Sequence, residues 1–293
     1  MSNKKILYLY TEDLNFFFKL NRELKKKNIQ FIILSGISKI PDLRAVLLTT
    51  LKDIRNLKGS YKKLKLLAYG KNENFNHYVN KILAAYRIGY KEFYSELVFS
   101  IDPGSKKIGM VVFLDDYYLV SHTFYDREGI ITTVKDYINC FQLDNPNPLK
   151  LTFKFGSGLL PMTIELIEGI SEFFRNRDYL HIFLINESKS SKFKIQNLKK
   201  KFKTKHELSA LILALRKGIE IDYRNSLEIY KKAKRQNSNY IMEFKNIRNN
   251  KENFSTFQEF VEKILKNEIS LSESSKLVNK VSNQGFLEKN RKE

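Results

Sequence analysis

The apolar positions of the chain recur with two different spacings, and these spacings predict its secondary structure. Short β-rich apolar runs predict strands, and longer stretches with apolar residues three or four positions apart predict helices. In the central part of the chain three strands come first, and helices and strands then alternate. The predicted strands are 97–101, 107–114, 117–125, 149–155 and 179–185, and the predicted helices are 129–142, 160–176 and 204–220.

The N-terminal part of the chain has its own pattern. An amphipathic helix from Thr11 or Glu12 to about Lys27 lies between two apolar strands, which predicts a βαβ unit. Glu12 and Asp13 are interpreted as acids of the first helical turn, where the helix dipole favours negative charge. The predicted strands of this part are 5–10, 29–34 and 44–49, and a second helix is predicted at 78–93.

The C-terminal part is charged and helical in pattern. A Thr256-x-x-Glu259 capping box precedes one apolar helical face, which predicts docking on the core or on a partner helix. The residues of that face are Phe257, Phe260, Val261, Ile264 and Leu265. We therefore predict a small α/β domain (1–94), a central domain (95–222) and a helical, basic extension (223–293) that is partly disordered from about Ser282.

The most specific motif of the chain lies at one predicted turn. It reads Ile101-Asp102-Pro103-Gly104-Ser105 and closes at Gly109, and the Pro103-Gly104 turn places Asp102 where its strand ends. The motif resembles the opening of the RNase H-like superfamily, in particular RuvC-type Holliday junction resolvases and their YqgF-type relatives. This resemblance implies that Asp102 binds the catalytic metal ion.

The order of the predicted elements is similar to the same superfamily over roughly 96–220. It implies an α/β fold whose RNase H-like core has three antiparallel strands plus two parallel strands, with helices on both faces. Right-handed crossovers place the fourth strand beside the first and the fifth outside it. A small α/β domain precedes this core and a helical tail follows it. The N-terminal domain resembles, more loosely, that of uncharacterised archaeal-type proteins with a YqgF-like core.

Two later segments supply the other candidate site residues. Asn186-Glu187-Ser188 resembles the D-E-x-x-[ST] motif of YqgF-type proteins, which implies that Glu187 is the second metal ligand. The helix from Lys205 resembles the closing helix of the superfamily, with His206 and Ser209 at the positions of its usual aspartates. His206 is then expected to ligate metal or handle protons. Glu207 is the reserve, although on an ideal helix it points about 100° away from His206.

The predicted chemistry is metal-dependent hydrolysis of phosphodiester bonds, with Mg²⁺ or Mn²⁺ as the cofactor. Two such ions about 3.5–4 Å apart can generate the hydroxide and stabilise the leaving oxygen. Hard cations of this kind take carboxylate oxygens, water and substrate phosphate as ligands. The predicted metal ligands are Asp102, Glu187 and His206, and Glu207 joins them as a candidate catalytic residue.

Two other function classes stay open. His206 and Ser209 in place of aspartates also fit a catalytically inactive RNase H-like module that only binds nucleic acid. In an actin-like ATPase or sugar kinase, residues 102–109 would instead form a phosphate loop. That fold needs a second D-x-G loop, and Gly156-Ser157-Gly158 lacks the acid.

The charge of the chain favours nucleic acid as its partner. There are 52 Lys and Arg against 32 Asp and Glu, a formal charge of +20, and residues 192–205 contain lysines but no acid. The predicted nucleic-acid-binding residues are Lys192, Lys194, Lys199, Lys200, Lys201, Lys203 and Lys205, with Gly156 and Gly158. Branched DNA is the favoured substrate, RNA is the alternative, and a homodimer stays open. A single cysteine and no long apolar stretch predict a cytoplasmic protein without a membrane segment.

Overall fold

The computed structural model describes residues 6–36, 45–55, 65–143, 145–174, 179–187, 202–222 and 259–277. Contacts divide the chain into two compact units. The first contains Met1–Tyr94 and Asp136–Asn145, and the second contains Ser95–Lys135 and Pro146–Glu293. The expectations for Phe257 and for the end of the chain from Ser282 lie outside the described residues.

The first unit contains a four-stranded sheet in the order β2-β1-β3-β4, in which all the pairings are parallel. Its elements are β1 (Leu7–Leu9), α1 (Leu14–Lys26), β2 (Phe31–Ile33), β3 (Val46–Thr50), α2 (Leu51–Ile54), β4 (Lys65–Tyr69) and α3 (Phe75–Ile88). The predicted βαβ unit corresponds to β1, α1 and β2, and the third predicted strand corresponds to β3. Sequence patterns missed β4 and the single turn of α2.

Local side-chain chemistry sets the helix ends of the first unit. The Asp13 carboxylate caps α1 by accepting a hydrogen bond from the backbone N–H of Phe16 at 2.9 Å. At its other end, α3 stops at Gly89, whose φ of 96° lies in a region that glycine tolerates best. The helix predicted to run to residue 93 was therefore too long at its C-terminal end.

The second unit contains a six-stranded sheet in the order β10-β9-β8-β5-β6-β7. Its strands are β5 (Glu96–Asp102), β6 (Ile108–Leu114), β7 (Tyr117–Phe124), β8 (Lys150–Gly156), β9 (Leu180–Ile185) and β10 (Ile219–Glu220). Strands β5, β6 and β7 form an antiparallel meander, β8 runs parallel to β5, and β9 runs parallel to β8. This is the predicted RNase H-like order, so the predicted fold is confirmed for this unit.

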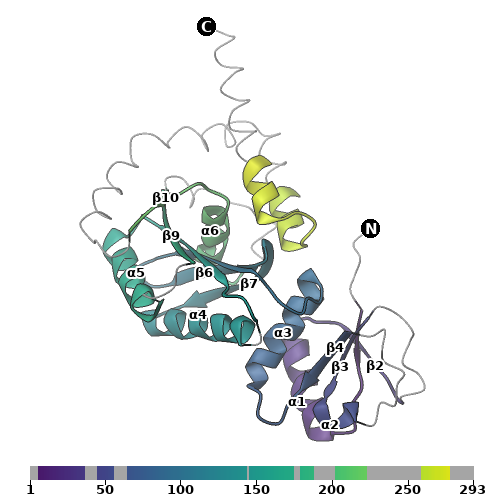
Figure 1. Cartoon of the computed structure of the whole chain (residues 1–293). Coiled ribbons are helices and arrows are strands. Elements are labelled where there is room, and N and C mark those ends of the chain that lie inside the picture. The colour runs from purple at the N-terminus through teal and green to yellow at the C-terminus, as the bar shows by residue number, and fades with distance from the viewer. Residues whose placement is uncertain are drawn as a thin grey trace. The chain divides into compact units, whose positions relative to one another are not determined.

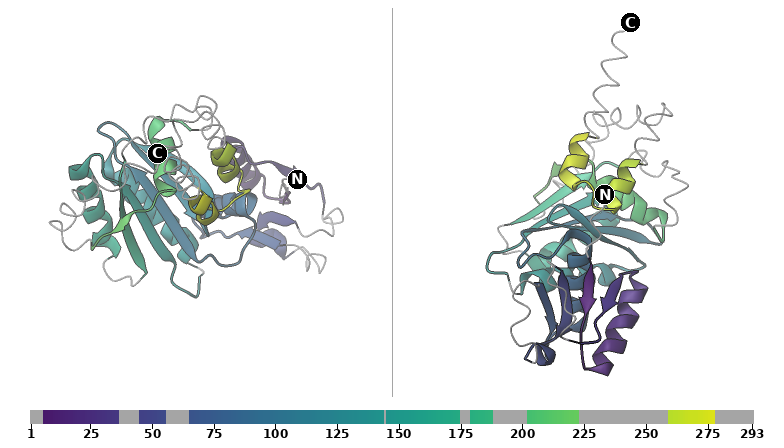
Figure 2. Two further views of the ribbon diagram at one scale, coloured as in Figure 1. Left: turned by 90° about the horizontal axis from the view of Figure 1, so that it is seen from above. Right: turned by 90° about the vertical axis from the view of Figure 1, so that its right-hand side faces the viewer.

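Helices cover both faces of this sheet. Figures 1 and 2 show α5 (Leu160–Phe174) and the start of α4 (Arg127–Gln142), up to residue 135, on one face and α6 (Lys205–Ala214) on the other. Because strand side chains alternate, Phe99 and Phe153 stack on each other while Ser100 reaches the carbonyl of Ala210 in α6. The side chains on the two faces of the sheet therefore belong to two separate cores.

The described part of the C-terminal extension packs on the α6 face. Its helical residues, 259–265 and 271–277, are drawn in yellow in Figure 1. Val261 and Ile264 are fully buried in the same apolar cluster as Leu211 and Ile212 of α6. This part of the extension belongs to the core of the second unit.

The end of α6 differs from the sequence prediction. A helix was predicted up to Glu220, but α6 ends at Ala214 and a short strand, β10, pairs with β9 in the antiparallel sense. The Lys154 ammonium of β8 donates hydrogen bonds to the carbonyls of Ala214 and Arg216, where the helix stops. Among the described helices, none combines the length and the apolar character that crossing a membrane requires.

Candidate active site

Asp102 and His206 meet at one end of the six-stranded sheet. Asp102 is the last residue of β5 and is 5% exposed, and His206 lies in the first turn of α6. A hydrogen bond of 2.7 Å joins Nδ1 of His206 to Oδ2 of Asp102. The structure thus brings together two of the predicted site residues, which are 104 positions apart in the sequence. The bond orients the imidazole and leaves Nε2 as the ring nitrogen for further chemistry.

The two glycines of the Asp102 motif make room for the start of α6. A Cβ atom on Gly109 would lie 2.1 Å from the carbonyl carbon of His206, and one on Gly104 would lie 2.4 Å from its Cε1. Backbone atoms cannot move aside as a flexible side chain can. The spacing of the motif is therefore explained by the close approach of α6 to the loop after Asp102.

Three strands hold α6 in place over the sheet. Besides the contact with Asp102, Ser100 of β5 donates a hydrogen bond of 2.7 Å to the carbonyl of Ala210. Lys154 of β8 binds the C-terminal carbonyls of the helix, and Ser121 of β7 donates to Glu207 near its start. These contacts fix the position of His206, because the helix that carries it is tied to the sheet along its length.

Glu187 follows β9 and lies over the turn after β8. A Cβ atom on Gly156 would lie 1.9 Å from its Oε1, and one on Gly158 would lie 2.1 Å from its Oε2. Both glycines therefore provide space for this carboxylate, a role that the sequence analysis did not foresee beside their predicted contact with nucleic acid. The Oε1 atom of Glu187 is buried and has no hydrogen-bond partner among the described residues.

The electrostatic surroundings of Glu187 favour its protonated form. Burial is the main cause and the Asp102 carboxylate the next, and together they raise the pKa of Glu187 to about 7. The Gly158 N–H, which donates to the carboxylate, and the charges of Arg216 and His206 act in the opposite direction. Asp102 is thus close enough to Glu187 for their charges to interact. Sequence reasoning missed Arg216, whose only signal is a cation directly after the apolar run of α6.

Glu207, the reserve residue, faces another strand. Glu207 is 1% exposed, and its carboxylate accepts hydrogen bonds from Ser121 at 2.7 Å and Thr123 at 2.6 Å, both on β7. The backbone N–H of Lys203 donates to the same carboxylate at 3.2 Å. The structure therefore gives Glu207 a place in the attachment of α6 to β7 and does not bring it to Asp102. Ser209 is also buried.

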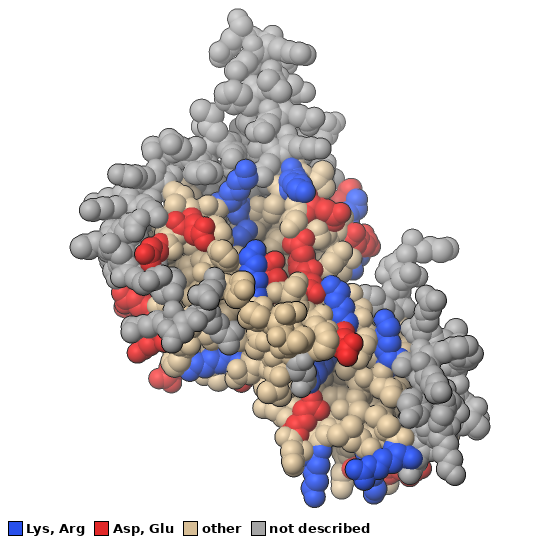
Figure 3. All heavy atoms as spheres, viewed as in Figure 1, with Lys and Arg blue, Asp and Glu red and all other residues tan. Residues whose placement is uncertain are grey.

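The predicted lysine cluster is described only in part. Lys203 and Lys205 are exposed, whereas Lys192, Lys194, Lys199, Lys200 and Lys201 lie outside the described residues. A hollow of about 420 Å³ at the start of α6 is lined by Ser105, Lys106, Lys107, Lys203, Thr204, Lys205 and His206. Sequence reasoning gave no role to Ser105, Lys106 and Lys107, which follow the Pro103-Gly104 turn. On the face shown in Figure 3, basic and acidic side chains are otherwise interspersed over the described residues.

The donor atoms at this end of the sheet fit one divalent cation better than two. Mg²⁺ is usually held by one or two protein carboxylates, with water and substrate phosphates as the remaining ligands. Asp102 and the unpartnered Oε1 of Glu187 match that donor set. Within the described ranges, no group of three or more His, Cys, Asp or Glu side chains is arranged to hold a metal ion. A second, fully protein-held ion therefore finds no donor set among these residues.

Comparisons with known proteins give little beyond this geometry. No protein-family profile matches the chain, and no curated protein matches it. Among solved structures, it is similar to the Argonaute Aa-Ago with externally bound siRNA, with 13% identity and a TM-score of 0.21 over 62% of this chain and 34% of that one. It is also similar to an exopolyphosphatase from Cytophaga hutchinsonii, with 11% identity and a TM-score of 0.13 over 56% of this chain and 55% of that one.

The chain thus spans about a third of the Argonaute and about half of the exopolyphosphatase. At these TM-scores neither likeness decides the fold. The RNase H-like assignment of the second unit rests on its strand order.

Proposed function

We propose that the second unit is a metal-dependent endonuclease that hydrolyses phosphodiester bonds in nucleic acid. Asp102 and Glu187 would hold one Mg²⁺ or Mn²⁺ ion, and His206 would move a proton. The observation that carries this proposal is the buried Oε1 of Glu187, which has no hydrogen-bond partner in the described part of the chain and lies near a second carboxylate. Strongly perturbed acids of this kind concentrate at functional sites.

The arrangement around Glu187 is energetically unfavourable without a ligand. Buried polar atoms are nearly always hydrogen-bonded in folded proteins, and an unsatisfied one costs about 1–3 kcal/mol. Two carboxylates that repel each other add to that cost. A divalent cation would remove both penalties, since it supplies the positive charge that the described residues around Glu187 supply only in part.

Each residue has a separate role in the proposed reaction. A divalent cation, when bound, would neutralise charge on the scissile phosphate and make a bound water more acidic. Asp102 and Glu187 would hold that cation, and Asp102 also orients His206 through the 2.7 Å hydrogen bond. Nε2 of His206 would then accept the proton of the attacking water or return one to the leaving oxygen.

The substrate class follows from charge and from the resemblance of the motifs. A formal charge of +20 favours a polyanion. The similarity of the Asp102 and Glu187 motifs to RuvC-type and YqgF-type proteins supports branched DNA first and RNA second. A panel of labelled branched, duplex and single-stranded substrates separates these cases.

A nucleic-acid-binding module without hydrolysis is the second candidate. It is favoured by the described residues around Asp102, which contain no third carboxylate positioned for metal, and by Ser209 at a position where resolvases carry an acid. An actin-like ATPase is disfavoured by the turn after β8. The Glu187 carboxylate fills the space over Gly156 and Gly158, where it would repel a nucleotide phosphate.

The test is a cleavage assay with the full chain. Labelled four-way junction, duplex DNA, single-stranded DNA and RNA are incubated with Mg²⁺ or Mn²⁺, beside Asp102→Asn, Glu187→Gln and the control Glu96→Gln. We expect cleavage that needs the metal and falls at least about 100-fold in the two site variants but not in the control. Binding without cleavage would favour the second candidate, and cleavage that is equal in all variants would contradict the proposal.

A further inference from the structure

We propose that the hollow at the start of α6 binds a backbone phosphate of single-stranded nucleic acid, while the Tyr125 ring stacks on a neighbouring unpaired base. The inference builds on the proposed function, because it places the strand beside Asp102 and His206. It does not depend on cleavage, since binding can be measured without a metal ion.

The lining of the hollow is suited to phosphate. Four of its residues are lysines, two carry hydroxyl groups, and none is acidic. Lys106, Lys203 and Lys205 are exposed and Lys107 is half-buried. Lysines that converge on one small volume repel one another, and a phosphate removes that repulsion while it releases counterions from the nucleic acid.

The position of the hollow relates it directly to the candidate active site. His206 forms part of its wall and is also hydrogen-bonded to Asp102. A phosphate in the hollow would therefore lie next to the acidic end of the sheet. Its lysines would offset the repulsion that Asp102 and Glu187 exert on a polyanion, and they would hold the strand in register with the acids.

Tyr125 supplies the feature that distinguishes single strands from duplexes. It directly follows β7, and its side chain is 72% exposed. The Nζ atom of Lys107, a residue of the hollow, lies 5.5 Å from the centre of the Tyr125 ring. An exposed aromatic ring beside a phosphate-binding cation is the arrangement with which proteins bind single strands. Bases inside a duplex are already stacked and cannot use such a ring.

The experiment measures binding in EDTA by fluorescence anisotropy with labelled single-stranded DNA, single-stranded RNA and duplex DNA. The variants are Lys106→Ala with Lys107→Ala, Tyr125→Ala and the conservative Tyr125→Phe. The matched control is Lys217→Ala with Lys263→Ala, which removes the same charge from two exposed lysines outside the hollow. Circular dichroism checks that each variant is folded.

We expect the wild-type chain to bind single strands more tightly than duplex. The Lys106 and Lys107 double variant should lose about tenfold or more in affinity, and its slope of log affinity against log salt should fall by about 0.7 for each lost phosphate contact. Tyr125→Ala should lose about fivefold or more, and Tyr125→Phe should keep most of the affinity. A comparison of the affinities for single-stranded DNA and single-stranded RNA shows whether deoxyribose or ribose is preferred.

Two results would overturn the inference. One is an equal loss of affinity in the double variant and in its charge-matched control, and the other is a Tyr125→Ala variant that binds like the wild type. These outcomes are separable from those of the cleavage assay. If the chain cleaves nucleic acid with metal but these substitutions do not change binding, the proposed function holds and the inference fails. If the substitutions weaken binding but no cleavage occurs, the inference holds and the proposed function fails.

Discussion

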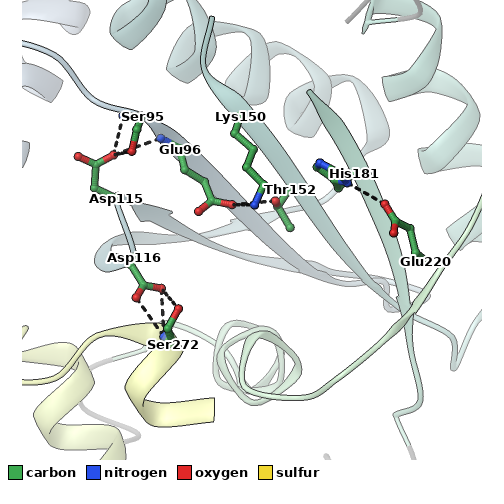
Figure 4. Close-up of polar contacts among 9 residues, drawn as sticks. All are labelled: Ser95, Glu96, Asp115, Asp116, Lys150, Thr152, His181, Glu220 and Ser272. Atoms are coloured by element: carbon green, nitrogen blue, oxygen red, sulfur yellow. Dashed lines mark hydrogen bonds and ion pairs between the residues drawn. The ribbon is translucent and has the colours of Figure 1, made fainter. Parts of the chain in front are cut away.

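The two ends of the six-stranded sheet both carry acidic residues, but their acids have different surroundings. Figure 4 shows the end at which β5 begins. There Asp115 accepts a hydrogen bond of 2.7 Å from the backbone of Ser95, and Asp116 accepts one of 3.0 Å from that of Ser272. Glu96 is paired with Lys150 at 3.3 Å and with Thr152 at 3.0 Å. Each of these acids has donors that stabilise its charge.

At the opposite end, where β5 stops, the pattern is reversed. There Asp102 is hydrogen-bonded to His206, while Oε1 of Glu187 is buried without a hydrogen-bond partner among the described residues, and the pKa of Glu187 is raised to about 7. Because both ends belong to one sheet, the fold itself does not impose the unfavourable arrangement. This difference is what our proposal of a ligand site at the Asp102 end predicts, with the acids at the Glu96 end serving stability.

The largest expected effect comes from closing the space under α6. Gly109→Ala would place a Cβ atom 2.1 Å from the backbone of His206, so α6 would have to shift away from Asp102. We expect a loss of about 1–3 kcal/mol in the free energy of unfolding, measured by urea denaturation. Gly36→Ala is the control, since a Cβ atom there meets no atom within 4 Å. Equal stability of the two variants would show that the backbone of His206 does not restrict the side chain at position 109.

The next effect concerns the protonation of Glu187. Its pKa is about 7 in the folded chain, against an ordinary value of 4.5 that applies in the unfolded chain. Between these values the folded state holds a proton that the unfolded state has lost, so stability falls as the pH rises through this window. The full penalty, about 3 kcal/mol at most, applies above pH 7.

Glu187→Gln should therefore stabilise the metal-free chain at pH 8, by about 1–3 kcal/mol, and have little effect at pH 5. Urea denaturation in EDTA at the two pH values measures this difference. Glu207→Gln is the contrasting variant, because Glu207 accepts hydrogen bonds from Ser121 and Thr123 and its loss should destabilise. A Glu187→Gln variant that is less stable than the wild type at pH 8 would contradict the comparison of the two ends.

The smallest effect is expected at the end of the sheet where β5 begins. Glu96→Gln weakens an ion pair whose Lys150 partner is half exposed, and Gln can still accept the hydrogen bond from Thr152. Such pairs contribute less than about 1 kcal/mol. The unfolding free energy and the cleavage rate should both stay near those of the wild type. A loss of cleavage here would mean that the acids of the two ends do not differ in function.

Sequence reasoning predicted the strand order of the second unit because its strands are strongly apolar and separated by clear turn residues. It also selected Asp102 and His206, which the structure brings into contact. It missed β4, a short strand of half-buried residues in a lysine-rich region, and it extended α6 too far. The tertiary contacts of Lys154 and the pairing of β10 with β9, which decide where that helix ends, leave no periodic signal in the sequence.

In the candidate site too, local sequence patterns predicted some features, and tertiary packing determines the others. The motif spacing indicated where the acids would lie, but the space that Gly156 and Gly158 leave for the Glu187 carboxylate depends on segments about 30 residues apart. The hollow lined by Lys106 and Lys203 likewise joins two loops that only the packing of α6 brings together. Such features arise from the fold, so the sequence alone could not show them.

The proposed function requires that the acids at the Asp102 end bind a divalent cation. Calorimetric titration of the full chain with Mn²⁺ tests this directly, with Asp102→Asn, Glu187→Gln and Glu96→Gln alongside. We expect the wild type and Glu96→Gln to bind the ion with the same affinity, and each of the other two variants to bind it at least about tenfold more weakly. Equal affinity in Asp102→Asn and the wild type would show that Asp102 does not hold the ion.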